Sequence, residues 1–298
     1  MKHIAPFLII CLLLSACNDP GKTEVEETSP SFQTTSYDDL VLLFNEWRSF
    51  EKPPLLDGAP DYTKATFEKR WSEFKELQSQ LKAIDTTHWS VENQVDWMIV
   101  WAEMNGYDFN HNILKPWVRD PAFYNVVWTY KSDVPAHEGP TNHGTTELWT
   151  YQFPLSESER SRFIKDLQVI PPFYRQAKQN LTGNARDLWV TGIRDIKNQS
   201  DVLATLRSRP GVSDDTELIS VINEAIGATD DLVSWLSDQS ASKTGPSGIG
   251  KENYTWYLQN VHLVPLTWDD EVMLLKRELA RAWTSLKLEE HRNRSLPE

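Results

Sequence analysis

Apolar residues recur at steps of three and four along most of the chain after residue 36, which is the pattern of amphipathic helices. The clearest stretch places five large side chains on one side: Phe67, Trp71, Phe74, Leu77 and Leu81. Ser36 can cap an earlier helix, with Asp39 at its third position. The residues that this helix turns inward are Leu40, Leu43, Phe44 and Trp47. Between the two helices, residues 52–62 form a loop that contains prolines and a glycine.

Capping residues predict the next helices. Ser90 precedes a helix that Gly106 is expected to end. The apolar side of this helix is expected to carry Val91, Val95, Met98, Ile99 and Ala102. Residues 107–154 read as irregular, because they contain Pro116, Pro121, Pro135, Pro140 and Pro154. Within them, FYNVVWTYK is compatible with a short strand, although no partner strand is evident.

The second half of the chain continues the helical pattern. Ser156 and Glu159 form a capping box for a helix that the pair Pro171-Pro172 interrupts. Further helices are expected toward Asn180, over residues 185–207, and from Ser213 onward. The sequence therefore predicts an all-α fold, a multi-helix antiparallel array with a Pro-rich irregular segment.

The last predicted helix begins at a second box, formed by Thr267 and Asp270. Its apolar residues repeat like a heptad: Val272, Leu275, Leu279, Ala282 and Leu286. If this helix packs on one side only, its remaining apolar face is exposed, which indicates a further packing partner.

The first 35 residues follow a different pattern. MKHIAPFLIICLLLSAC has a basic start, a short apolar run and small residues before Cys17, which is typical of a secretory signal, and its LSAC ending resembles a bacterial lipobox. We expect a signal peptide over residues 1–16, a lipid on Cys17 that attaches the chain to a membrane, a flexible polar tether over residues 17–35, and a helical domain over residues 36–298.

Charge and cysteine content narrow the location and the partners. Cys11 leaves with the signal peptide and Cys17 carries lipid, so the mature chain is expected to have neither thiol nor disulfide in an oxidising compartment. A net charge of −13 argues against nucleic-acid partners. Asn18, rather than the aspartate that marks inner-membrane retention, favours the outer membrane of a cell envelope.

The stretch GPSGIGKENYTWYL at residues 245–258 looks like a phosphate-binding loop but lacks its chemistry. Gly250-Lys251 is followed by Glu252 instead of a magnesium-binding hydroxyl, and the loop follows a helix rather than a strand. We expect these glycines to end one helix and to let the backbone pass close to a neighbour before the next helix.

Two other groups invite a catalytic reading, and for both we favour a structural one. The stretch from His137 to His143 resembles a zinc-peptidase motif, but its second histidine comes two residues late and Gly139-Pro140 prevents a helix. We therefore expect a solvated loop, with a metal site as the lesser alternative. Paired acidic residues elsewhere suit acid/base work, yet polar helix faces explain them as well. They are Asp96 and Glu103, and Asp108 with His111. Near the end, Glu289-Glu290 with His291 could supply ligands, but we favour a polar helix turn there.

Tryptophan is unusually frequent, with 13 residues. Several, such as Trp71, lie on apolar stripes, where core packing explains them. Trp117, Trp128 and Trp149 lie in the irregular segment and are better candidates for a cleft that binds a peptide or glycan, Trp117 and Trp128 foremost.

Longer stretches carry a resemblance. WSVENQVDWMIVWAEMNGYDFNHNILKPWVRDPAFY, ELWTYQFPLS, IPPFYRQAKQNLTGNARDLW and GIGKENYTWYLQNVHLVPLTWDDEVMLLKRELARA resemble the bacterial "domain of unknown function 885" family from Tyr37 onward. The resemblance implies a helical, often lipid-anchored protein related to zinc peptidases, with an HExxH-type motif in a C-terminal half. Gly248, Gly250 and Tyr254 match the turn and tyrosine that precede that half, and Tyr257 joins them as a candidate cleft residue.

These observations leave two main functional hypotheses. The first is an envelope lipoprotein that forms the helical N-terminal half of a zinc-peptidase-like protein, shapes its substrate cleft and is inactive alone. This chain has no HExxH, so no metal ligand is assigned in it, and zinc and a missing C-terminal half would belong to a longer form. The alternative is a non-catalytic envelope protein that binds or scaffolds a peptide or glycan. A hydrolase using Asp96, Glu103 or Asp108 is a third reading.

Overall fold

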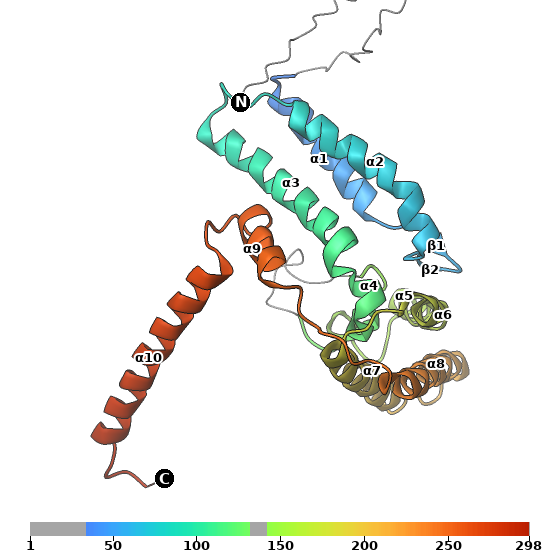
Figure 1. Cartoon of the computed structure of the whole chain (residues 1–298). Coiled ribbons are helices and arrows are strands. Elements are labelled where there is room, and N and C mark those ends of the chain that lie inside the picture. The colour runs from blue at the N-terminus through green and yellow to red at the C-terminus, as the bar shows by residue number, and fades with distance from the viewer. Residues whose placement is uncertain (1–33, 132–141, 298) are drawn as a thin grey trace, which may run out of the picture. The chain divides into compact units, whose positions relative to one another are not determined.

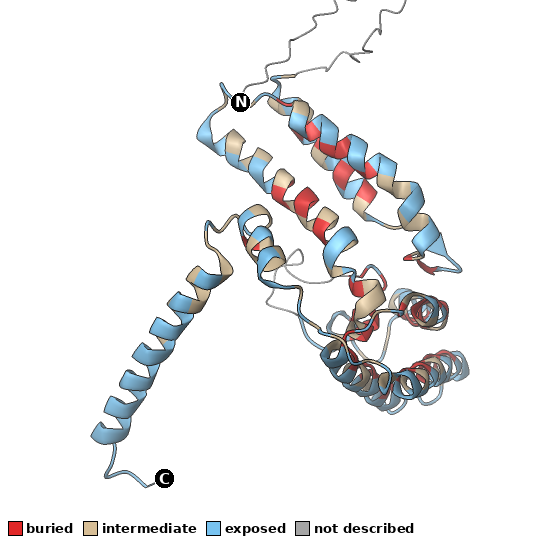
Figure 2. Cartoon of the chain, in the orientation of Figure 1, coloured by how far each residue is buried: buried red, intermediate tan, exposed pale blue. Residues whose placement is uncertain are grey.

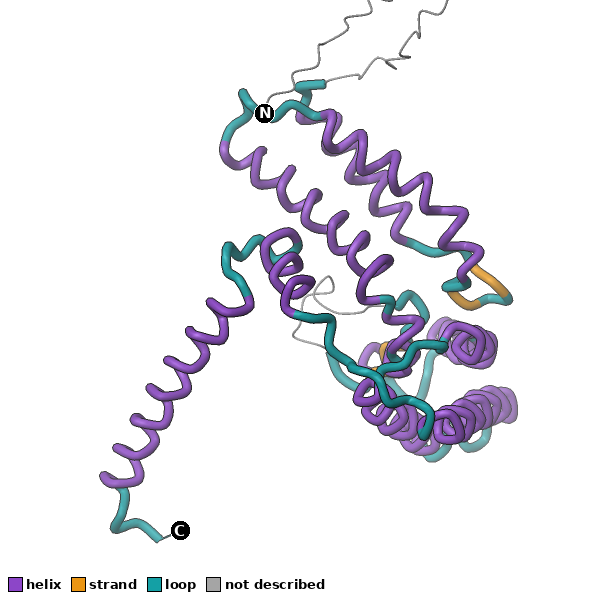
Figure 3. Tube along the Cα trace, viewed as in Figure 1, coloured by secondary structure: helices purple, strands orange, loops and turns teal. Residues whose placement is uncertain are grey.

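The computed structural model describes residues 34–131 and 142–297, and it confirms an all-α, multi-helix class (Figures 1 and 3). The first three helices are α1 (Tyr37–Glu51), α2 (Lys64–Ala83) and α3 (Val91–Phe109). Four more form a second group: α5 (Glu157–Gln168), α6 (Ile170–Asn180), α7 (Arg186–Leu206) and α8 (Thr216–Ser240). The remaining helices are α4 (Pro116–Arg119), α9 (Lys251–Asn260) and α10 (Trp268–Arg292). No helix in these described ranges combines the length and apolarity needed to span a membrane.

The first core lies among α1, α2 and α3. Its centre is aromatic: the Trp47 ring is fully buried, and its centroid lies 5.5 Å from that of Tyr107 and 6.0 Å from that of Phe74. Leu40, Leu43 and Trp47 are buried as the spacing predicts, and so are Phe74, Leu77 and Leu81 on α2. Helical spacing alone therefore identifies the inward faces of α1 and α2.

The prediction of which face of α3 is buried is wrong. Val91, Val95, Met98 and Ile99 are exposed, whereas Ala102 of the same expected set is buried beside Val100, Met104 and Phe109. The side of α3 that carries large rings faces the core instead. The indole N–H of Trp97 on this side donates to the carbonyl oxygen of Leu81 at 3.0 Å. Aromatic packing thus overrides the smaller aliphatic stripe.

Gly106 does not end α3. A Cβ at this position would lie 3.3 Å from Cγ1 of Val261, so the glycine lets the chain around α9 approach the helix. The helix continues to Phe109 and then widens into a π-helical turn, Asn110–Leu114. The left-handed Lys115, with φ of 46°, redirects the chain into α4.

The second core joins α5 to α8. Pro171-Pro172 lie in the first turn of α6, where no backbone donor is needed, so the predicted break between α5 and α6 is confirmed. The long helices α7 and α8 pack together through Trp189, Ile196, Leu203, Ile222 and Leu232. Gly192 on α7 allows the 3-10 turn η2 (Pro121–Tyr124) to pack closely against the helix, because a Cβ at this position would lie 2.7 Å from the nitrogen of Ala122.

Among the described residues, two pairs of short strands accompany the helices, and Ala59 of one pair and Val127 of the other are buried in the second core. β1 (Leu55–Leu56) and β2 (Ala59–Pro60) form a hairpin through Asp57-Gly58, whose φ angles of 53° and 85° suit such a turn. β3 (Val127–Trp128) pairs in parallel with β4 (Thr146–Glu147), so FYNVVWTYK does contain a strand, and it has a partner. A 3-10 turn, Leu148–Thr150, follows β4.

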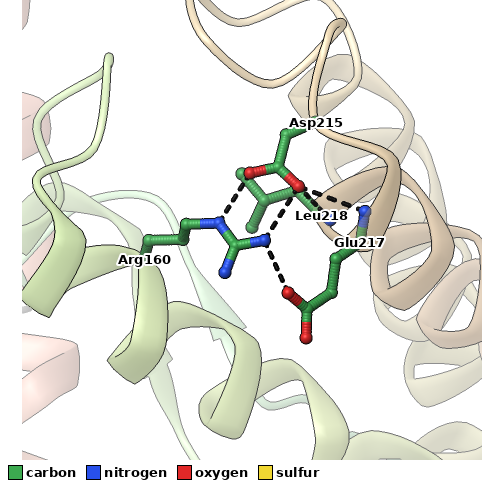
Figure 4. Close-up of polar contacts among 4 residues, drawn as sticks. All are labelled: Arg160, Asp215, Glu217 and Leu218. Carbon is green, nitrogen blue, oxygen red and sulfur yellow. Dashed lines mark hydrogen bonds and ion pairs between the residues drawn. The ribbon is translucent and has the colours of Figure 1, made fainter.

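Helix α8 begins two residues later than expected. Its cap is Asp215 rather than Ser213, because one carboxylate oxygen of Asp215 accepts the backbone N–H groups of Glu217 at 3.1 Å and Leu218 at 3.0 Å. The guanidinium of Arg160 on α5 donates to both oxygens of the same carboxylate, at 2.6 and 2.9 Å, and to the carboxylate of Glu217 at 2.6 Å (Figure 4). The guanidinium and the backbone donors hold the pKa of Asp215 at about 2. The side chain of Asp215 therefore caps the N-terminus of α8 and also links this helix to α5.

Both capping boxes are confirmed, at Ser156/Glu159 before α5 and at Thr267/Asp270 before α10. Helix α10 nevertheless contains no buried residue, and it is pale blue along most of its length in Figure 2. Its predicted stripe is open: Leu275 is 66% exposed, Leu279 58% and Leu286 48%. Within the described residues, nothing covers this apolar face.

The cap assignment can be tested on α8. Replacing Asp215 with Ala removes the acceptor for two helix N–H groups and the partner of Arg160, so we expect a loss of about 1–2 kcal/mol in the free energy of unfolding. Ser213→Ala is the matched control and should change the unfolding free energy by less than about 0.5 kcal/mol. Urea unfolding measures both, and equal losses would contradict the assignment.

Candidate functional site

A cleft of about 950 Å³ lies where α1, α2, α3, α4, η2 and α9 meet. Rings form much of its lining: Tyr62, Phe67, Tyr107, His111, Trp117, Phe123, His143 and Tyr257. Charged groups enter from α1, α2 and α3 and from the residue after α1: Arg48, Glu51, Lys52, Arg70 and Glu103. We call this space the aromatic cleft.

Two stacked rings form a central part of the cleft wall. The centroids of Phe67 on α2 and Trp117 on α4 lie 4.1 Å apart, with the rings nearly parallel. His111, on the π-helical turn, lies edge-on to Phe67 at 4.5 Å and 5.3 Å from Trp117. The extra width of that turn and the left-handed Lys115 after it bring His111 and Trp117 to the same place.

The two histidines of the cleft are held in the neutral form. Burial lowers the pKa of His111 to about 4; nearby Asp108 opposes this shift, and Lys115 and Arg70 add to it. Desolvation lowers the pKa of His143 at the rim, and the charges of Lys52 and Arg70 lower it further. A neutral imidazole can accept a hydrogen bond, so both rings can contact a polar ligand without adding charge.

Two tyrosines of the cleft, Tyr62 and Tyr107, stay protonated. Burial raises the pKa of Tyr107 to about 12, and burial also raises that of Tyr62, whose hydroxyl accepts the backbone N–H of His143 at 3.0 Å. Neither of these two phenols therefore adds negative charge to the cleft wall.

The acidic groups of the cleft are already bound. Arg48 lies 2.7 Å from a carboxylate oxygen of Glu51 and 2.6 Å from one of Glu103. Glu103 also accepts the indole N–H of Trp47 at 3.2 Å. Burial raises the pKa of Glu51, and Arg48 opposes that shift. These contacts indicate a structural network rather than a free acid/base pair.

The basic groups Arg70 and Lys52 differ from Arg48. No carboxylate of the described residues forms an ion pair with either of them. The guanidinium of Arg70 lies over the Phe50 ring, 4.2 Å from its centroid, and donates to the Phe50 carbonyl oxygen. Arg70 is therefore oriented by an aromatic ring and a backbone oxygen, while its charge remains available.

Two of the six candidate cleft residues, Trp117 and Tyr257, lie in the aromatic cleft. The carbonyl of Gly248 accepts from Arg119 at 3.4 Å, Gly250 (φ of 86°) precedes α9, and Tyr254 donates to Glu271 at 2.6 Å. Trp128 lies on β3 and is 37% exposed. These four residues do not line the cleft.

The prediction for the glycines of residues 245–250 is confirmed in part. A Cβ at Gly245 would lie 2.4 Å from the carbonyl oxygen of Asn184, so the close backbone approach is confirmed there. Gly248 has open space around it. Helix α9 begins directly after the left-handed Gly250.

The other acidic candidates have structural partners. Asp96 accepts from the Tyr37 hydroxyl at 2.7 Å, and Asp108 binds Lys75 at 2.5 Å and Asn112 at 2.6 Å. On the exposed end of α10, Glu289 pairs with Arg292 and Glu290 with Lys287, beside an exposed His291. His137 and Glu138 lie outside the described residues, whereas His143 is exposed at the cleft rim.

Sequence reasoning missed several cleft residues. Phe67 reads as a core residue from its spacing, and Arg70 carries no local signal of a site. The nearest clue was His111, which was singled out only as a partner for Asp108. The structure places His111 against the cleft rings instead.

The pKa of His111 is directly measurable. In the folded chain, its imidazole should titrate at about pH 4 by NMR, whereas in the urea-unfolded chain it should titrate near its ordinary value of about 6.5. Because the unfolded state takes up the proton first, stability should fall as pH drops from about 6.5 toward 4. A folded-state midpoint near 6.5 would place the ring in water and contradict this geometry.

Comparisons of the chain with protein-family models, with curated proteins and with solved structures found no match. In the described part of the chain, no three His, Cys, Asp or Glu side chains are grouped so that they could hold a metal ion.

Proposed function

We propose that this chain is a lipid-anchored cell-envelope protein whose helical body binds a peptide in the aromatic cleft. The observation that carries the proposal is the cleft itself: stacked rings, neutral histidines and basic groups without acidic partners line one space of about 950 Å³. Clefts lined by aromatic rings and a few polar groups are typical of ligand sites. The stretches that resemble the domain of unknown function 885 support a peptide as ligand, because that family is related to peptidases.

In this proposal, the body shapes a substrate cleft and does not cleave by itself. The bound state of Glu51 and Glu103 supports this role, since both carboxylates are held by Arg48. A non-catalytic binding or scaffold protein would use the same cleft. The two roles differ in whether a longer form of the protein cleaves what the cleft binds.

The cleft assignment is tested with a tryptophan pair. Trp117→Ala removes one ring of the stack, so we expect peptide binding, followed by intrinsic fluorescence or calorimetry, to weaken about three- to tenfold. Trp128→Ala is the control, since its ring lies outside the cleft, and it should bind like the wild type. Equal weakening in both variants, or a wild type that binds no peptide of a broad panel, would contradict the proposal.

The lipid anchor is tested separately, because Cys17 lies outside the described residues. In a bacterial host, the full chain should sediment with membranes and carry diacylglycerol on Cys17 by mass spectrometry. The Cys17→Ser variant should lose the lipid and leave the membrane fraction. An unlipidated mature chain, or a variant that stays with the membrane, would show that the LSAC motif is not an attachment site.

A further inference from the structure

Arg70 is a partly exposed cation that lines the aromatic cleft. The chain has 43 acidic and 30 basic residues, and its described surface shows many Lys and Arg side chains in ion pairs. Arg70 is only partly exposed, yet no carboxylate is within ion-pair distance of it among the described residues. A partly desolvated charge without a counterion is costly, so an anion that enters the cleft gains more there than at an exposed lysine.

The surroundings of Arg70 supply no negative charge in contact with it. Its charge acts on Tyr62, Tyr107, His111 and His143, and these four groups are neutral near pH 7. Acidic groups do occur nearby, since Glu51 and Glu73 both influence Tyr107. Glu51 is bound by Arg48, however, and Glu73 forms no ion pair with Arg70.

Lys52, directly after α1, adds a second cation to that of Arg70 on α2. It follows the last residue of α1 and is exposed at the cleft, and both its charge and that of Arg70 lower the pKa of His143. Both cations therefore line the same cleft as this rim histidine and act on it. The Phe50 carbonyl takes one donor of Arg70 and leaves the rest of its planar fork free, which is the geometry that binds a carboxylate through two hydrogen bonds.

We propose that Arg70 and Lys52 form a carboxylate-binding subsite of the aromatic cleft, which takes the C-terminal carboxylate of a peptide and places its last side chain against Phe67 and Trp117. This inference rests on the proposed function, because it names the part of the peptide that the cleft recognises. An organic carboxylate suits the site better than a free inorganic anion, since the cations lie beside apolar rings.

The test compares a free carboxylate with its amide. The full chain is titrated by calorimetry with acetyl-alanyl-phenylalanine and with the same dipeptide as its C-terminal amide. We expect the acid to bind at least about tenfold more tightly than the amide. Lys52→Met and Arg70→Met should each reduce this preference, mainly by weakening binding of the acid.

A matched control lies on the same helix as Arg70. Lys82→Met changes an exposed lysine of α2 outside the cleft and should keep the wild-type preference. Arg70 also holds the Phe50 carbonyl, so its variant is first checked for folding by circular dichroism. The Lys52 variant carries the test if the Arg70 variant unfolds, because Lys52 is exposed and makes no such contact.

The outcomes separate this inference from the function on which it rests. Equal affinity of acid and amide for the wild type, at a measurable level, would overturn the carboxylate subsite and leave the peptide cleft standing. A preference that survives in both cation variants would also overturn it. Failure of both dipeptides to bind the wild type would count against the subsite and the peptide cleft together.

Discussion

The contact between Phe67 and Trp117 is the interaction on which the cleft depends. Phe67 comes from α2 and Trp117 from α4, and both rings pack against the core that includes Tyr62, Phe123 and Phe173. Phe67 also meets His111, which lies beside Trp71 and Tyr107 of the first core. The two cores are thus joined by ring contacts. These bulky, flat side chains meet at the junction without filling it, and the cleft is the space that remains.

The charge that remains in the cleft is set by which of its ionisable groups are paired or neutral. The acidic groups at its edge are held by Arg48, and Tyr107 and His111 stay neutral because burial opposes their charged forms. The remaining charge is positive and comes from Lys52 and Arg70. An acidic protein therefore presents a basic recess with apolar walls, which is the combination expected for a ligand with a carboxylate and an apolar side chain.

Local signals explain how much of the fold was predictable. The boxes at Ser156/Glu159 and Thr267/Asp270 depend only on residues three apart, so the sequence identifies them directly. The face of α3 depends on which side chains α1 and α2 present, and there the rings of Trp97 and Tyr107 outweigh the stripe from Val91 to Ile99.

The cleft was less predictable than the helices, because its residues are distant in sequence. Arg70, His143 and Tyr257 come from three separate parts of the chain and meet only through tertiary packing. Trp117 and Tyr257 could be proposed as isolated aromatic residues in the irregular and glycine-rich segments. The exposure of Leu279 on α10 is likewise set by the absence of a covering neighbour among the described residues, which an amphipathic pattern does not reveal.

A crystal structure of the chain with acetyl-alanyl-phenylalanine tests the central claim most directly. The account predicts the carboxylate within about 3 Å of the Arg70 guanidinium, with the phenyl ring against Phe67 and Trp117. A peptide bound elsewhere, for example along the exposed stripe of α10, with the aromatic cleft unchanged, would contradict it.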